Sequence, residues 1–315
     1  MKPRNPTFHE KCVRFFLILS RWLLIFSLIC IAGSNLCTAD QERLYKGKTF
    51  SEWVSQIDAE IPIQVGHEPE YVQAIHYFGT NEIPTLIRWI KSDSTALETQ
   101  KLAEMQQAIE KGTNLPAIGP ATYSSSFRAE LVLGILGAEA RPAIPALTQI
   151  AMNSNDSVQF EASIRSLAYI GADSLPSFIT ILTNGPPDAR YEAISYLPVF
   201  HTDVVVALPA VIKCLEDKNE KIGDEAADFL SRSDLPHSIL IPALTNELAT
   251  ASVATRLRIL RCFYFMEPPL TPSPRKAVPA LLAAMQDTNT YISNLASNAL
   301  LKIAPESMSN SAPLR

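Results

Sequence analysis

The sequence predicts an all-α fold, an α-solenoid in which antiparallel helix pairs stack into a right-handed superhelix. A short motif, apolar-Pro-x-apolar, recurs six times, and apolar residues follow each proline at helical spacing. No segment shows the convincing alternation of apolar and polar residues that marks a half-buried strand. The composition, with 47% hydrophobic and 19% charged residues, provides the apolar surface that a large core needs. From the repeat length we expect about six to seven helix pairs.

The prolines of the repeated motif mark the start of the second helix in each pair. They are separated by 61, 31, 33, 33 and 37 residues, and they are Pro84, Pro145, Pro176, Pro209, Pro242 and Pro279. Proline suits the first turn of a helix, because its missing N–H would have no partner there. Counted from the proline, positions −1, +2, +3 and +6 form an apolar stripe, so we expect positions +1, +4, +5 and +8 to face away from the core.

The first helix of each pair is recognised by a small residue near its middle. The alanines in register are Ala162, Ala193, Ala226 and Ala296. A small side chain lets a neighbouring helix approach closely. We expect Gly79, Gly137 and Gly171 to end first helices in a left-handed conformation.

Residues 1–39 have the pattern of an export signal or a membrane anchor. This segment carries a net charge of +4, whereas residues 40–315 carry −9. An apolar run at Trp22–Gly33 is followed by small residues up to Ala39, as in a cleaved signal peptide. Retained residues 15–33 would instead anchor the chain in the inner membrane. Either alternative exports residues 40–315 to the periplasm or the extracellular space.

The rest of the chain divides into three parts. Residues 40–67 are expected to cap the array with a short helix carrying Trp53, residues 68–305 to form the solenoid, and residues 306–315 to be a disordered tail. Within the solenoid, the long first spacing predicts a degenerate unit with a loop at residues 94–124. The Pro-rich segment 267–274 predicts a stiff loop in the last pair.

The repeat resembles HEAT repeats, in particular the short bacterial kind named after phycobilisome lyases. Residues 125–151 carry the resemblance best, with Arg128-Ala129, Leu136-Gly137 and Ile144-Pro145-Ala-Leu147. The arginine expected after the leading apolar residue of a first helix occurs at Arg190, but Gln159, Gly223 and Ser293 replace it elsewhere. The resemblance covers residues 68–304 and implies the helical-pair fold, with only the family name to suggest a bilin lyase.

Chemical motifs are scarce. The five histidines form no metal-binding motif, and His67-Glu68 is the only His-Glu pair in the exported part, too few for the di-iron site known on some HEAT-repeat enzymes. Neither a nucleophile elbow nor a phosphate loop is present. Cys214 and Cys262 lie in different units and could pair, although buried free thiols are the simpler interpretation. We expect no cofactor and no metal, and the acidic body argues against nucleic-acid binding.

The remaining candidate site is a surface. Second helices of such solenoids usually line the concave side, and position +4 on them carries a polar, lightly basic series. With Trp89 at +5, the candidate partner-binding residues are Arg88, Trp89, Gln149, Thr180, Lys213 and Asn246. Trp89 is either an exposed anchor or tucked under residues 112–124. We therefore expect a non-catalytic protein–protein interaction scaffold of the cell envelope with protein partners. The alternative is a cofactor-binding or lyase-like enzyme on the same fold.

Overall fold

The computed structural model describes residues 43–57, 69–92, 106–111, 124–153, 155–266, 275–305 and 307. The chain divides into two units, Met1–Thr49 and Phe50–Arg315. The described part of the first unit is a tight turn in which Tyr45 and Lys48 form an isolated β-bridge. The described part of the second unit is built from helices.

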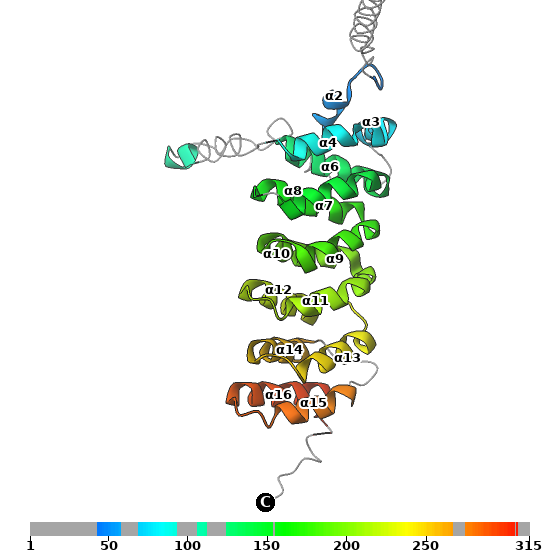
Figure 1. The fold of residues 1–315 in the computed structure, drawn as a ribbon. Helices are drawn as coiled ribbons and strands as arrows, with labels where there is room; N and C mark the ends of the chain where they lie inside the picture. Colours follow the sequence, from blue (N-terminus) through cyan, green and yellow to red (C-terminus); the bar gives the residue numbers. More distant parts are fainter. Residues whose placement is uncertain are drawn as a thin grey trace, which may run out of the picture. The chain divides into compact units, whose positions relative to one another are not determined.

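Within the described residues, the second unit contains six helix pairs, the short N-terminal helix α2 (Phe50–Val54), a helical segment at residues 106–110 and a last helix, α16 (Thr290–Ile303) (Figure 1). The pairs are α3 (Glu70–Phe78) with α4 (Ile83–Ile90), α6 (Ser125–Leu136) with α7 (Ile144–Asn153), α8 (Ser157–Ile170) with α9 (Leu175–Asn184), α10 (Pro187–Tyr196) with α11 (Leu208–Cys214), α12 (Glu220–Arg232) with α13 (His237–Leu248), and α14 (Val253–Phe265) with α15 (Val278–Ala284), followed by α16 (Thr290–Ile303).

Successive pairs stack through like helices. The first helices α6, α8, α10, α12, α14 and α16 each contact the next, and the second helices α7, α9, α11 and α13 do the same. This arrangement confirms the predicted all-α solenoid, because each pair buries its apolar side chains against its neighbours. The handedness of the superhelix stays a prediction.

The core lies between the two rows of helices. On the second helices the position two residues after the proline is buried in every pair, at Leu86, Leu147, Phe178, Val211, Leu244 and Leu281. On the first helices Ala162, Ala193, Ala226 and Ala296 are fully buried. The repeated apolar stripe and the small mid-helix residue therefore have the roles that the sequence predicts.

A glycine with positive φ ends three of the first helices. Gly79, Gly137 and Gly171 have φ of 57°, 49° and 94° with ψ between −124° and −156°. The positive φ was expected, but this ψ differs from that of a left-handed helical cap. The combination of φ and ψ is one that residues other than glycine adopt even more rarely than the left-handed helical conformation. A 3-10 turn then leads into the second helix, as at Gly79–Glu82 and Gly137–Ala143.

One second helix departs from the predicted start. Five of the six motif prolines lie at the N-terminus of their helix, but α13 begins at His237 and holds Pro242 in its interior. The link before α13 has no glycine and no 3-10 turn, so this helix begins about one turn earlier relative to its motif proline than the other second helices do. Pro242 leaves the carbonyl of Ser238 without its helical partner, and Ser238 is exposed, so water can satisfy it.

Arginines on first helices bind the acidic turn that follows the second helix of the same pair. Arg190 of α10 binds both carboxylate oxygens of Asp217, at 2.9 and 3.0 Å, and the carbonyl of Gly185 at 2.6 Å. Arg256 of α14 binds one carboxylate oxygen of Asp287, which follows α15. Asp217 also accepts the backbone N–H of the residue that caps α12. Each arginine thus joins a first helix to the cap of the next pair.

Several expected features lie partly or wholly outside the described residues. These are residues 1–39, most of 94–124, the loop 267–274 and most of the tail 306–315. The pairs on either side of 94–124 contact each other directly, through α4 and α6. In the capping segment, the expected helix is present as α2 (Phe50–Val54); it buries Trp53 and packs on α3.

Two segments are long and apolar enough, by length and composition alone, to cross a membrane. They are Ser125–Asn153 and Pro187–Cys214. Each consists of two solenoid helices joined by a 3-10 segment and packed into the stack. They are therefore accounted for as core helices, and the predicted anchor at residues 15–33 stays a prediction.

Candidate functional site

The predicted series at position +4 lies exposed on five second helices. Arg88, Gln149, Thr180, Lys213 and Asn246 are all exposed, on α4, α7, α9, α11 and α13. Since α7, α9, α11 and α13 contact one another in order, the last four of these residues follow one another along neighbouring helices. Helix α4 packs on α6 and α8 instead, so Arg88 extends the series from a differently packed pair. We call the five residues the polar strip.

The neighbours of the polar strip differ from the expected ones. Position +1 is buried or half-buried, and Ser177 there accepts a 2.8 Å hydrogen bond from Thr148 of the preceding second helix. Position +5 is buried at Ile150, Ile181 and Cys214. Positions +1 and +5 therefore face the neighbouring second helix, and five of the six motif prolines are exposed beside the strip.

Trp89 is part of the packing around α2. Its ring is half-buried and stacks on Phe50, with centroids 5.7 Å apart and an interplanar angle of 22°. Phe50 also contacts Phe78 edge to face at 5.5 Å. The sequence alternatives for Trp89 were an exposed anchor and a side chain covered by residues 112–124. Neither of them included Phe50, on which the ring stacks. The alternative involving residues 112–124 lies outside the described residues, apart from Ser124.

Both described cysteines are buried free thiols. Burial raises the pKa of Cys214 to about 11 and that of Cys262 to about 12. Thiolate is the nucleophile and the metal ligand, so neither residue is poised for such chemistry. Their sulfurs lie against the carbonyls of Leu182 and Ala227, at 3.8 and 3.3 Å.

Within the described ranges, no three His, Cys, Asp or Glu side chains are grouped to hold a metal ion. His76 pairs with Glu139 at 3.1 Å, while His67 and Glu68 fall outside those ranges. A site that includes His67 therefore stays untested.

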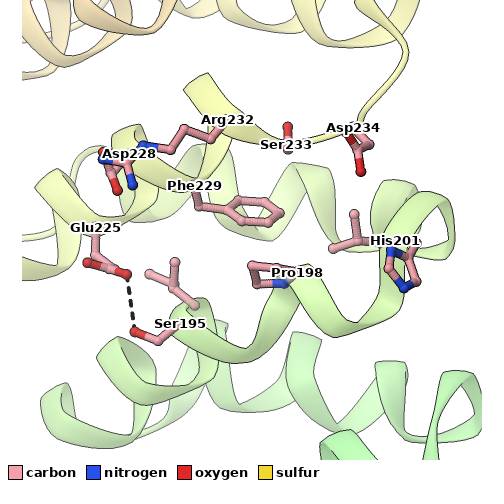
Figure 2. A pocket seen from close by; sticks show the side chains of 11 residues that line it. Ser195, Pro198, His201, Glu225, Asp228, Phe229, Arg232, Ser233 and Asp234 are labelled. Atoms are coloured by element: carbon pink, nitrogen blue, oxygen red, sulfur yellow. Dashed lines mark hydrogen bonds and ion pairs between the residues drawn. The ribbon is translucent and has the colours of Figure 1, made fainter. Parts of the chain in front are cut away.

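The sequence did not reveal a hollow on the side of the first helices. About 240 Å³ in volume, it lies between the end of α10, the 3-10 segment Leu197–Ala207 and the second half of α12. Figure 2 shows Phe229 across its middle, Glu225 and Asp228 towards one end, and His201 towards the other. Its lining comes from two separate segments, within residues 194–204 and 225–234, which belong to neighbouring repeats, so no local motif marks it.

A row of glutamates in register leads to this hollow. Glu161, Glu192 and Glu225 each precede the small alanine of their first helix, on α8, α10 and α12. The pKa of Glu192 is raised, first by desolvation and then by the negative charge of Glu161, with Arg165 opposing and Glu225 adding to the rise. The negative charge of Glu225 likewise raises the pKa of Tyr191.

No protein-family model matches the chain, and no curated protein matches it either. Among solved structures, a designed armadillo repeat protein is 14% identical, with 70% of this chain and all of that one covered and a TM-score of 0.33. An engineered protein is 16% identical over 73% of this chain and 97% of its own length, with a TM-score of 0.34. A computationally designed armadillo repeat protein for modular peptide recognition is 15% identical over 70% and 98%, with a TM-score of 0.33. At these scores the assignment of this chain to the helical-repeat solenoids rests on its own helix packing.

Proposed function

We propose that the chain is a non-catalytic protein-interaction scaffold of the cell envelope, built on HEAT-like repeats, and that the polar strip binds a protein partner. The observation that carries the proposal is the register of the strip. Four stacked second helices each present an exposed polar side chain at the same position, so the strip offers a regular series of hydrogen-bonding groups. Stacked helix pairs typically form extended binding surfaces of this kind.

Lys213 is the one cationic residue among the four stacked positions of the strip. It lies beside a hollow of about 330 Å³ that is also lined by Thr183, Asn184 and Asp217. Thr180, one pair earlier, donates to its own helix at 2.9 Å, to the carbonyl of Pro176, so its side chain is held in one orientation. A partner segment along the strip would meet a held hydroxyl at Thr180 and then an exposed cationic group at Lys213.

Site-specific photo-crosslinking in the cells that make the protein tests this proposal. A photoreactive amino acid replaces Thr180 or Asn246 in the strip, and Tyr169, which is exposed on a first helix, serves as the control position. We expect a discrete protein adduct from both strip positions and none from the control. Lys213→Glu should weaken the adduct at least severalfold, since it reverses the charge of the strip's lysine.

The same sample distinguishes the alternatives. Intact-mass analysis of the recovered chain shows whether residues 1–39 were removed. Adducts from Tyr169 but from neither strip position would contradict the assignment of the strip. A chain recovered without any adduct, but with a bound metal or additional mass, would favour the cofactor-binding alternative.

A further inference from the structure

The hollow between α10 and α12 combines an apolar middle with polar ends. Phe229 and Pro198 lie in the middle, as Figure 2 shows, and Val204 also lines the hollow. Glu225 lies towards one end, where its carboxylate accepts a 3.1 Å hydrogen bond from Ser195. Asp234 lies towards the other end, on the same side as His201. A ligand that fits must therefore have an apolar stem and a polar head.

The unneutralised charge of the hollow is negative. Asp228 forms an ion pair with Arg232 at 2.6 Å, so those two charges compensate each other. Glu225 and Asp234 have no ion pair with any of the described residues. His201 is the only other ionisable lining residue of this hollow. The head group that complements the hollow is therefore a cation.

Charged side chains of both signs lie next to the hollow. A second, shallower hollow shares Glu225 and Asp228 with the first and adds Asp188 and Asp224. Lys221 and Arg261 also line it, and Asp224 already binds Arg258 at 2.9 Å. Asp228 is paired with Arg232, so Glu225 is the carboxylate shared by both hollows that has no ion pair among the described residues.

The backbone at the edge of the hollow is held in a conformation that costs free energy. His201 has φ of 47° and ψ of −126°, the same region that Gly79, Gly137 and Gly171 adopt after their first helices. A non-glycine residue in this region is strained, and such strain is concentrated at functional sites. Glycine at this position would remove the imidazole from the hollow.

We propose that this hollow binds an arginine side chain from a linear segment of a protein partner. The guanidinium would pair with Glu225, which its planar donors can contact in two places. The methylene stem would lie along Phe229 and Pro198, where the ring face also attracts the cation. A volume of about 240 Å³ accommodates one such side chain. The proposal rests on the scaffold function but uses the first helices, so it can fail while the polar strip stands.

Methyl NMR of the full chain locates binding at this site. Ile194 and Val204 line the hollow and report on it, and Ile292 of α16 reports on a distant part of the solenoid. The probe is the peptide acetyl-Gly-Ser-Arg-Ser-Gly-amide. Its matched control replaces arginine by citrulline, which has the same shape and no charge. The protein variants are Glu225→Gln with Asp234→Asn in the hollow and Glu161→Gln, in register with Glu225 but on α8, as control.

We expect the arginine peptide to shift the Ile194 and Val204 signals with a dissociation constant of the order of 1 mM, and Ile292 to stay unchanged. The citrulline peptide and the hollow variant should each bind at least about tenfold more weakly, and Glu161→Gln should bind as the parent does.

Equal binding of the citrulline peptide, undiminished binding to the hollow variant, or no shift at 10 mM peptide would each overturn the proposal. Spermidine binding as tightly as the peptide would also overturn it, because the occupant would then be a free cation rather than a protein segment. The methyl spectrum of each unbound variant shows directly that it is folded.

Discussion

At the scale of single residues, Gly223 of α12 shows how neighbouring repeats share space. A Cβ built at Gly223 would lie 2.4 Å from the guanidinium carbon of Arg258, which reaches over from α14. Arg258 is buried and donates to the carbonyls of Leu215 and Glu220, at 2.9 and 3.2 Å. At the corresponding position of α10, Arg190 binds the carbonyl of Gly185 from its own helix. Arg258 thus occupies the space that a side chain at position 223 would need.

We expect Gly223→Ala to lower the free energy of unfolding by about 1–3 kcal/mol, because the methyl group displaces a buried guanidinium from its carbonyl partners. The matched control is Gly134→Ala in α6, where the new Cβ would meet Tyr169 at an ordinary 3.5 Å. That change should be neutral or stabilising by up to about 1 kcal/mol, since alanine is the better helix former. Urea unfolding of the two variants measures both values, and equal effects would contradict the packing argument.

His201 provides a second test at this scale. Glycine adopts a positive φ without a steric penalty, so His201→Gly should raise the free energy of unfolding by about 1–3 kcal/mol. The reciprocal control is Gly171→Ala, which places a Cβ at φ 94° and should destabilise the protein by a similar amount. Thermal unfolding of both variants is the measurement. A destabilised His201→Gly variant would mean that imidazole contacts outweigh the backbone strain.

At the scale of helices, the row of glutamates couples α8, α10 and α12 electrostatically. The pKa of Glu192 is raised by desolvation and by Glu161, so the folded state holds its proton more tightly than the unfolded state does. The ionised carboxylate therefore destabilises the fold at pH values above its raised pKa. This penalty decreases as the pH falls and is gone below the ordinary value of 4.5.

We therefore expect Glu192→Gln to be more stable than the parent chain at pH 7, and the difference to disappear below about pH 4. Urea unfolding at a series of pH values between 3.5 and 8 measures the difference. A difference that is constant over this range would show that the side-chain packing at position 192, rather than its charge, is responsible. Glu161→Gln should show the same trend more weakly, because it removes one source of the repulsion.

Helix starts show how far a local pattern predicts an element. Pro84, Pro145 and Pro176 begin their helices because a preceding glycine first ends the helix before them and a 3-10 turn reverses the chain. Around Pro242 the motif is the same, yet α13 begins five residues earlier. The proline fixes only its own φ and removes one donor, so the link that precedes it decides where the helix starts.

At the scale of the whole molecule, the repeat period predicted the solenoid, since apolar stripes of successive helices can be buried only against each other. The exposed register of the polar strip was also predictable. The exposure of the flanking positions could not be predicted, because positions +1 and +5 meet the next second helix. The stacking of Trp89 on Phe50 could not be predicted either, because it depends on the placement of α2. The hollow between α10 and α12 could not be predicted from the sequence, because its lining comes from two repeats that meet only in the folded chain.

The direct contacts between neighbouring pairs have a consequence for size. The pairs α8/α9 and α10/α11 are each held on both sides by contacts between first helices and between second helices. A duplication or loss of one unit of about 33 residues would leave interfaces made by the same kinds of helix contact as before. The number of repeats is therefore the property of this fold that can change most easily in evolution. Its binding surfaces can become longer or shorter without a new core.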